Sequence, residues 1–199
     1  MKPLRGLPLT DETVPSSAAA ADSDEALMRR FTTGDSQAFD VLFERYARPL
    51  HRYLQRLSGS PAVAEDLTQL TFLSMVRARA RFQPGARVRP WLYAIATNVA
   101  HDWRRRGRLE SLTPDGALPA DVATEELPLK DEGLERAVQR ALLQVPEKLR
   151  VPILMHRFEG LSFREIAEAL GVTETAVKLR AHRGYQRLRV LLAPLQGEL

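Results

Sequence analysis

The 199-residue chain contains no cysteine, which excludes disulfide bonds and thiolate metal sites. Its four histidines are scattered and lack the spacing of a histidine metal motif. His156 and Glu159 lie three residues apart, and we expect a surface pair there rather than two metal ligands. The chain also lacks a glycine-rich phosphate loop and a G-x-S-x-G motif, so neither a catalytic residue nor a cofactor is predicted.

Long apolar runs are absent as well. No stretch approaches the ~20 apolar residues that cross a bilayer, and residues 1–24 lack the continuous apolar core of a signal peptide. These absences predict a soluble, cytoplasmic protein without membrane insertion. With 44% hydrophobic residues, the chain is long enough for one large or two small globular domains.

Charge is distributed unevenly along the chain, although the formal net charge is only +4. Basic residues gather in two segments, 77–108 and 178–189, and residues 110–133 between them are acidic. Two basic segments separated by an acidic spacer predict two separate contacts with a polyanion.

Residues 162–189 form the most informative stretch of the sequence. Ser162 and Glu165 have the S-x-x-E spacing of a capping box, in which each side chain binds a free backbone N–H of the first helical turn. Apolar residues then recur at helical spacing until Gly171, a residue suited to end a helix at positive φ. Thr173 is a suitable N-cap for a second helix. Two short helices joined at a glycine predict a helix-turn-helix.

The second of these helices combines a narrow apolar seam with a basic outer face. The seam contains Val177, Ala181, Gly184 and Leu188. The outer face carries Lys178, Arg180, His182, Arg183, Arg187 and Arg189. A solvated αα-hairpin is the alternative. We favour duplex DNA binding, because the capping box, the turn and the uniform charge agree.

The N-terminal half predicts a series of helices. Residues 24–32 form the first, residues 34–36 interrupt the chain, and apolar spacing continues over 39–57 with Pro49 expected to kink or divide that helix. Residues 58–61 end it and start a helix over 62–81 that is apolar on nearly all sides. Such a helix either lies deep in a bundle or packs both on its own core and on a partner.

Residues 82–90 contain two prolines and a glycine, which predicts a loop before a helix that Trp91 opens. The inward face of that helix is expected to carry Leu92, Ile95, Ala96, Val99 and Trp103. The free face is expected to present Tyr93, Thr97, His101, Arg104 and Arg105. We expect the tryptophans in the core and the arginines on nucleic acid, where they follow phosphates or contact unpaired bases.

The remaining sequence completes an all-α fold of two small helical domains joined by a flexible acidic linker. Residues 134–145 have a clean helical stripe, Pro146 opens another helix that Gly160 closes, and Pro152 is expected to distort it. The predicted organisation is a disordered tail (1–22), a first domain (23–106), a linker (107–133), a helix-turn-helix domain (134–192) and a tail (193–199).

Four segments in this order resemble the extracytoplasmic-function (ECF) sigma factors of bacterial RNA polymerase. They are GDSQAFDVLFERY (34–46), AEDLTQLTFL (64–73), FQPGARVRPWLYAIATNVAHDWRRR (82–106), and the segment 145–184, which begins VPEKLR and contains the helix-turn-helix. The resemblance implies an alternative sigma factor that binds core polymerase and directs promoter recognition, DNA melting and transcription initiation. It also implies that the two domains are sigma regions 2 and 4.

The resemblance implies a role for individual residues. Docking on the clamp helices of the largest polymerase subunit falls to Asp66, Gln69, Leu70 and Leu73. Binding of the single-stranded −10 element falls to Gln83, Arg87, Arg89, Tyr93, Asn98, Asp102, Arg104 and Arg105. Recognition of the duplex −35 element falls to Thr173, Thr175, Lys178, Leu179, His182 and Arg183. The polymerase flap and an anti-sigma factor are further expected partners.

Three residues depart from the family pattern. Leu70 stands where the family usually carries an acid, and Pro152 is unusual in its helix. Leu179 replaces a small polar residue, and an exposed apolar group there favours contact with a thymine methyl.

Two other classes of protein remain possible at this point. One is a conventional helix-turn-helix repressor or activator that binds duplex DNA as a dimer, and the other is a sigma mimic that binds an anti-sigma factor.

Overall fold

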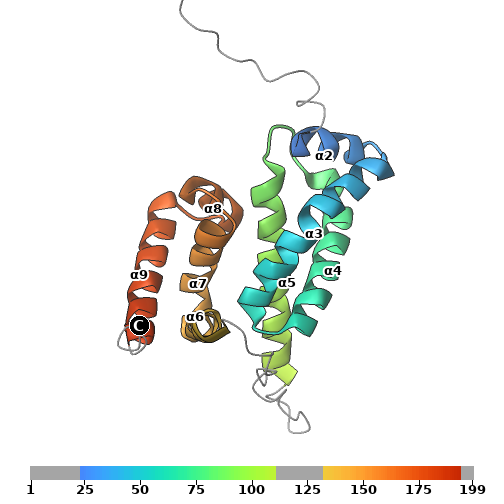
Figure 1. Ribbon diagram of the computed structural model, residues 1–199. Helices are drawn as coiled ribbons and strands as arrows, with labels where there is room; N and C mark the ends of the chain where they lie inside the picture. Colours follow the sequence, from blue (N-terminus) through green and yellow to red (C-terminus); the bar gives the residue numbers. More distant parts are fainter. Residues whose placement is uncertain (1–22, 111–131, 194–199) are drawn as a thin grey trace, which may run out of the picture.

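The computed structural model describes residues 23–110 and 132–193, and every regular element in this part of the chain is a helix (Figure 1). The elements are α2 (Asp24–Thr32), α3 (Ser36–Ser58), α4 (Pro61–Ala78), the 3₁₀ turn η1 (Arg79–Arg81), α5 (Val88–Glu110), α6 (Glu132–Gln144), α7 (Glu147–Ile153), the π turn η2 (Leu154–Phe158), α8 (Phe163–Leu170) and α9 (Glu174–Leu192). The predicted all-α fold is confirmed. The predicted tails lie largely or wholly outside the described residues, as does most of the predicted linker. No described helix is long and apolar enough to cross a membrane.

Local signals set the boundaries of the first helices. The Asp35 side chain accepts hydrogen bonds from two backbone N–H groups at the start of α3. Gly59, at φ 85°, ends that helix, and Ser60 caps α4 with Pro61 in its first turn. These boundaries confirm the prediction. α3 is not divided at Pro49, because the helix continues through it to Ser58.

The predicted start of α5 at Trp91 is wrong, since the helix begins at Val88. The backbone N–H of Val88 donates to the Glu25 carboxylate of α2 at 3.2 Å, which supplies a cap from a distant part of the chain. Pro90 fits the first turn because the N–H groups there have no partner within the helix. The loop is therefore shorter than predicted, and α5 continues to Glu110, beyond the expected boundary at residue 106.

Pro152 distorts its helix as predicted. α7 gives way after Ile153 to the π turn η2, in which the backbone N–H of Glu159 donates to the carbonyl of Leu154, five residues earlier. Gly160, at φ 66°, then ends the run.

The helices form two groups that pack against each other (Figure 1). In the first group α3 contacts α2, α4 and α5, and in the second α9 contacts α6, α7 and α8. Between the groups, α5 lies against α8, and α3 lies against α6, α7 and η2. Buried apolar residues of both groups join in one continuous core. The contact between the two groups of helices determines which of the predicted site residues remain exposed.

Gly184→Ala is expected to destabilise the C-terminal helices. A Cβ at this position lies 3.0 Å from the backbone carbonyl of Leu149 and 2.5 Å from Cδ1 of Ile153, so the Ile153 side chain must move and the Leu149 backbone must shift by a few tenths of an ångström. Overpacking outweighs the higher helix propensity of alanine, for a net loss of about 1–2 kcal/mol in unfolding free energy. Urea denaturation measures the change in unfolding free energy. Gly107→Ala is the control, because its Cβ meets nothing within 4 Å, and equal stability of the two variants would contradict a close contact at Gly184.

Candidate nucleic-acid interface

The helix-turn-helix is confirmed by its backbone geometry. The backbone N–H of Ser162 donates to the Glu165 carboxylate at 2.7 Å, and the backbone N–H of Glu165 donates to Ser162 Oγ at 3.2 Å, which completes the capping box. Gly171 ends α8 at φ 62°, and the Thr173 hydroxyl accepts from the N–H of Ala176 to cap α9. The turn therefore holds α9 at a fixed angle to α8.

One face of α9 is buried and the other is open. The predicted seam of Val177, Ala181, Gly184 and Leu188 is buried. Every residue predicted to recognise the −35 element is exposed, namely Thr173, Thr175, Lys178, Leu179, His182 and Arg183. Leu179 is 48% exposed among these polar and basic residues. The geometry provides a basic helical face that includes the apolar Leu179, which suits a DNA major groove.

α4 also has a free face. The four residues predicted to bind polymerase, Asp66, Gln69, Leu70 and Leu73, are all exposed. Leu73 is 51% exposed and Leu70 41%, whereas Leu67 and Phe72 are buried on the other side of the helix. The sequence left open whether α4 lies deep in a bundle or has a partner. Its exposed leucines show that α4 does not lie deep in the bundle and that one of its faces is free and partly apolar.

Phe43 of α3 extends this apolar face, and the sequence did not identify it as a surface residue. Its side chain is 44% exposed, and its ring centroid lies 4.6 Å from that of Phe72 on α4. Phe43 belongs to the helical stripe over 39–57 that predicts burial, so periodicity alone could not separate it from the core.

The residues predicted to bind the −10 element have two different environments. Gln83, Arg87, Arg89, Asn98 and Arg105 are exposed, and Asp102 and Arg104 are partly buried. Tyr93 is only 1% exposed, so its predicted place on a free face of α5 is wrong. The same holds for Thr97, whose hydroxyl lies 2.8 Å from that of the buried Tyr53.

Tyr93 is buried because both groups of helices cover it. Its ring packs edge-on against Tyr53 at 5.2 Å, and its hydroxyl donates to the Glu159 carboxylate at 2.5 Å. Burial raises the pKa of the Tyr93 hydroxyl, and the neighbouring Glu159 carboxylate raises it further. Tyr93 therefore stays protonated and acts as a hydrogen-bond donor.

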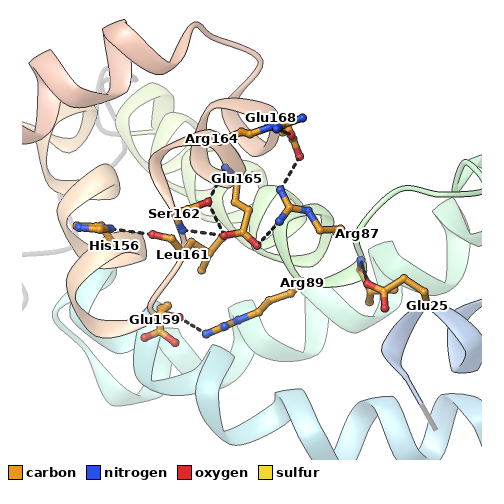
Figure 2. Close-up of polar contacts among 11 residues, drawn as sticks. Glu25, Arg87, Arg89, His156, Glu159, Leu161, Ser162, Arg164, Glu165 and Glu168 are labelled. Atoms are coloured by element: carbon orange, nitrogen blue, oxygen red, sulfur yellow. Dashed lines mark hydrogen bonds and ion pairs between the residues drawn. The ribbon is translucent and has the colours of Figure 1, made fainter. Parts of the chain in front are cut away.

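Carboxylates from the C-terminal helices meet the arginines of the loop and of α5. Arg87 forms ion pairs with Glu165 at 2.8 Å and with Glu168 at 3.2 Å (Figure 2). Arg89 donates to the backbone carbonyl of Glu159 (Figure 2). Near the other end of α5, Arg104 pairs with Glu147. With Tyr93, four of the predicted −10 residues thus contact the second group of helices or the turn that follows η2.

Glu165 has two roles in this arrangement. Although partial burial opposes ionisation, hydrogen bonds from Ser162 and the charge of Arg87 hold the pKa of the Glu165 carboxyl below its ordinary value. The residue thus stays ionised while it caps α8 and pairs with Arg87. The sequence identified only the capping role.

Two further predictions need correction. Glu159 is 7% exposed against α5, and His156 contacts the Leu161 carbonyl and stacks on Phe163, so the two are not a surface pair. Trp103 is 38% exposed and lies outside the core, while Trp91 is half-buried against Phe82.

Residues 23–110 and 132–193 contain no cluster of three or more histidine, aspartate or glutamate side chains that could hold a metal ion.

Comparison with known proteins gives a consistent result for both groups of helices. A family model described as Sigma-70 region 2 matches residues 42–110, and one described as Sigma-70, region 4 matches residues 135–188. The chain is 41% identical over 175 residues to the RNA polymerase sigma factor CarQ of Myxococcus xanthus, covering 86% of this chain and 99% of that protein. It is 34% identical to the ECF RNA polymerase sigma factor SigM of Mycobacterium tuberculosis, covering 87% and 86% of the two chains.

Two solved structures are also similar. One is CnrH in complex with the cytosolic domain of CnrY, with a TM-score of 0.66, 26% identity and coverage of 86% of this chain and 97% of that one. The other is the sigma factor RpoE in complex with the anti-sigma factor NepR from Bartonella quintana, with a TM-score of 0.66, 26% identity and coverage of 78% and 96%.

Proposed function

The chain belongs to the extracytoplasmic-function sigma factors of bacterial RNA polymerase, and from this premise we propose how its surfaces divide the work of promoter recognition. As a sigma factor it binds core polymerase and directs promoter recognition, DNA melting and transcription initiation. Sigma factors are initiation factors rather than enzymes. In this proposal region 2 is formed by residues 23–106 and region 4 by residues 134–192, with residues 107–133 as the linker.

The exposed face of α9 binds the −35 element as duplex DNA. Lys178 and Arg183 supply the cations that bind phosphate oxygens and guanine edges, and the exposed position of both supports this role. Lys178 also pairs with Glu174 at 2.7 Å, an exposed contact that DNA phosphates can replace at little cost.

Leu179→Ser is expected to relax the preference for thymine at one position of the −35 element. The leucine side chain is exposed beside the basic residues and offers an apolar contact to a thymine C5-methyl group, which a hydroxyl does not. Sequencing of promoters selected by holoenzyme from a randomised −35 library measures the change. An unchanged preference at every position would exclude contact between Leu179 and a base.

The exposed face of α4 docks on the clamp helices of the largest polymerase subunit. Leu70 and Leu73, together with Phe43, supply the apolar centre of this face, and Asp66 and Gln69 supply its polar part. In region 4, a hollow of about 490 Å³ whose lining includes Leu142, Ile153 and Phe158 is suited to the polymerase flap.

The loop over 82–87 and the outer face of α5 hold the −10 element as a single strand. DNA melting costs ~1.4 kcal/mol per base-pair step. Stacking of an unpaired base on an aromatic protein side chain stabilises the melted state by about 1–3 kcal/mol per base. Asn98 and Arg105 are exposed and offer polar groups for bases and phosphates, as does Gln83 in the loop. The linker joins two modest contacts into one stronger contact by raising the effective concentration of the second.

The proposal also includes an anti-sigma factor as a binding partner. It places the protein in the cytoplasm, associated with the nucleoid when it is part of the holoenzyme. The similar RpoE structure contains an anti-sigma factor, and the CnrH structure contains the cytosolic domain of CnrY, which supports a partner of this kind here.

One observation carries the proposed function: the same chain exposes both a basic helix-turn-helix face on α9 and an apolar docking face on α4. A conventional repressor needs only the first. Runoff transcription with purified protein, bacterial core polymerase and genomic DNA fragments tests the proposal. Discrete start sites that share two spaced upstream elements are expected. Specific duplex binding by the protein alone, without initiation, would identify a repressor instead.

A further inference from the structure

We propose that Glu25 of α2 is a positioning residue for −10 recognition, because it fixes the loop over 82–87 at the start of α5. The inference rests on the proposed function of this loop in binding the −10 strand. It adds that α2, which carries none of the residues assigned to DNA or polymerase, decides the shape in which the loop meets an unpaired base.

The Glu25 carboxylate caps α5. It accepts from the backbone N–H of Val88 at 3.2 Å, and Figure 2 shows the Glu25 side chain beside the start of α5. The N–H groups of a first helical turn have no partner within the helix, and Val88 is buried, so water replaces the carboxylate only after a local rearrangement. The positive end of the helix dipole also favours a carboxylate there. Glu25 therefore determines where α5 begins and where the loop ends.

α2 also contacts the other end of the loop, where α4 passes into η1. The Arg79 guanidinium of η1 lies 5.7 Å from the centre of the Phe31 ring of α2, within the range of a cation–π attraction. Arg79 also donates to the Val76 carbonyl at 3.0 Å, which ties the guanidinium to the end of α4. The two elements that the loop joins, η1 and α5, thus both lie against α2.

Between these two ends the loop has little freedom of its own. The backbone N–H of Ala86 donates to the Gln83 carbonyl at 3.1 Å, and Pro84 and Gly85, the latter at φ 84°, occupy the centre of this turn. A proline followed by a glycine at positive φ is typical of a type II turn. Because the loop is short and closed by this turn, a shift at either end moves all of it, including the Gln83 side chain.

α2 is itself anchored in region 2. Leu27 and Met28 are buried in the core, and Asp24 pairs with Arg45 of α3 at 2.9 Å. The Tyr46 hydroxyl, also of α3, donates to the same Asp24 carboxylate. An anchored α2 holds the loop in one shape before DNA arrives. Such preorganisation raises affinity, because less conformational freedom is lost on binding.

Removal of the Glu25 carboxylate tests the inference in the full-length chain, assembled with core polymerase. The probe is a fluorescently labelled promoter from the runoff experiment whose −10 segment is left unpaired, and a second template carries a scrambled −10 segment. Glu25→Ala is expected to lower the preference of the holoenzyme for the intact segment about fivefold, since the loop occupies its binding shape for less of the time. Glu25→Gln keeps an oxygen that accepts from Val88 and is expected to restore most of the preference.

Two variants serve as controls. E25Q removes the same charge as E25A, so a difference between them reports the hydrogen bond and not the charge. Ser60→Ala removes the cap of α4, at the end of that helix away from the loop, and controls for a general loss of stability in region 2. Its preference is expected to stay within about twofold of that of the unmodified protein. An unchanged preference in E25A, or equal losses in E25A and S60A, would overturn the inference.

Hydrogen exchange of the Val88 amide, followed by NMR in the free full-length protein, reports the cap without DNA. This amide is expected to exchange about tenfold faster in E25A than in the unmodified chain, and to stay protected in E25Q. Unchanged exchange in E25A would overturn the positioning role.

The double variant Q83A/R87A separates this inference from the proposed function, because both changes lie in the loop itself. If Q83A/R87A keeps its preference for the intact −10 segment, the assignment of the loop to the −10 strand is wrong. A loss in Q83A/R87A without a loss in E25A would overturn only the role of α2.

Discussion

Leu73→Asp is expected to weaken binding of the chain to core RNA polymerase by about a hundredfold, which corresponds to ~3 kcal/mol. Leu73 lies in the α4 face proposed to dock on the clamp helices, where it is 51% exposed in the free chain. A carboxylate placed there loses its water on docking and has no partner on an apolar surface. The fold itself is expected to keep its stability to within about 0.5 kcal/mol, because the side chain points outward. Competition for labelled core polymerase measures the affinity.

Leu134→Asp is the matched control for that experiment. This leucine lies on α6 and is 58% exposed, so the same change is made on an open apolar side chain outside the docking face. The double change Asp66→Ala with Gln69→Ala is expected to give a smaller loss than Leu73→Asp, since polar residues at the rim contribute less than a buried apolar centre. Unchanged affinity for Leu73→Asp, or an equal loss in Leu134→Asp, would exclude the assignment of α4.

Lys178→Ala combined with Arg183→Ala is expected to lower transcription from a promoter with an intact −35 element by about a hundredfold. Each side chain is exposed on α9, and each good contact to a base or phosphate contributes ~1–3 kcal/mol. On a template whose −35 element is scrambled, the double variant is expected to lose much less, because only its contacts to phosphate oxygens are lost there. Runoff transcription on the two templates, at several salt concentrations, provides the comparison.

The salt series adds a second readout to the same experiment. Loss of a phosphate contact reduces the salt dependence of binding by about one unit of slope per contact. Arg140→Ala, at an exposed position on α6, serves as the control for a simple loss of positive charge. Equal losses on the intact and scrambled templates would mean that Lys178 and Arg183 act elsewhere than at the −35 element.

The sequence predicted those features that depend on neighbouring residues. The capping box of Ser162 and Glu165, the glycine that ends α8 and the start of α4 at Pro61 all rest on contacts within one helical turn. The exposed face of α9 was predictable for the same reason. Its buried seam and its basic side alternate with the helical period, so orientation follows once the seam is found.

The features that the sequence missed depend on contacts between distant segments. The start of α5 at Val88 depends on a cap from Glu25 of α2, sixty-three residues earlier. The burial of Tyr93 depends on Tyr53 of α3 and on Glu159 in the turn after η2, which are far apart in the sequence. No spacing rule relates such residues, and a polar aromatic side chain on a helix is equally compatible with a free or a covered face.

The two free leucines of α4 are an intermediate case. Apolar residues around the helix allowed either a deep position or a partner, and the pattern could not decide between them. Packing decides, because α3 and α5 cover only part of the helix and leave Leu70 and Leu73 exposed.

The π turn after Pro152 has a consequence for how the two regions can diverge among related proteins. One extra residue in a helical turn rotates everything that follows by about 100° around the axis. Phe158, which contacts Arg56, is the last residue of this turn, and Glu159, which contacts Tyr93, follows it directly. A single extra residue in η2 thus affects the angular register between regions 2 and 4. Evolution can change that register, and with it the coupling of the two regions, without altering any residue that contacts promoter or polymerase.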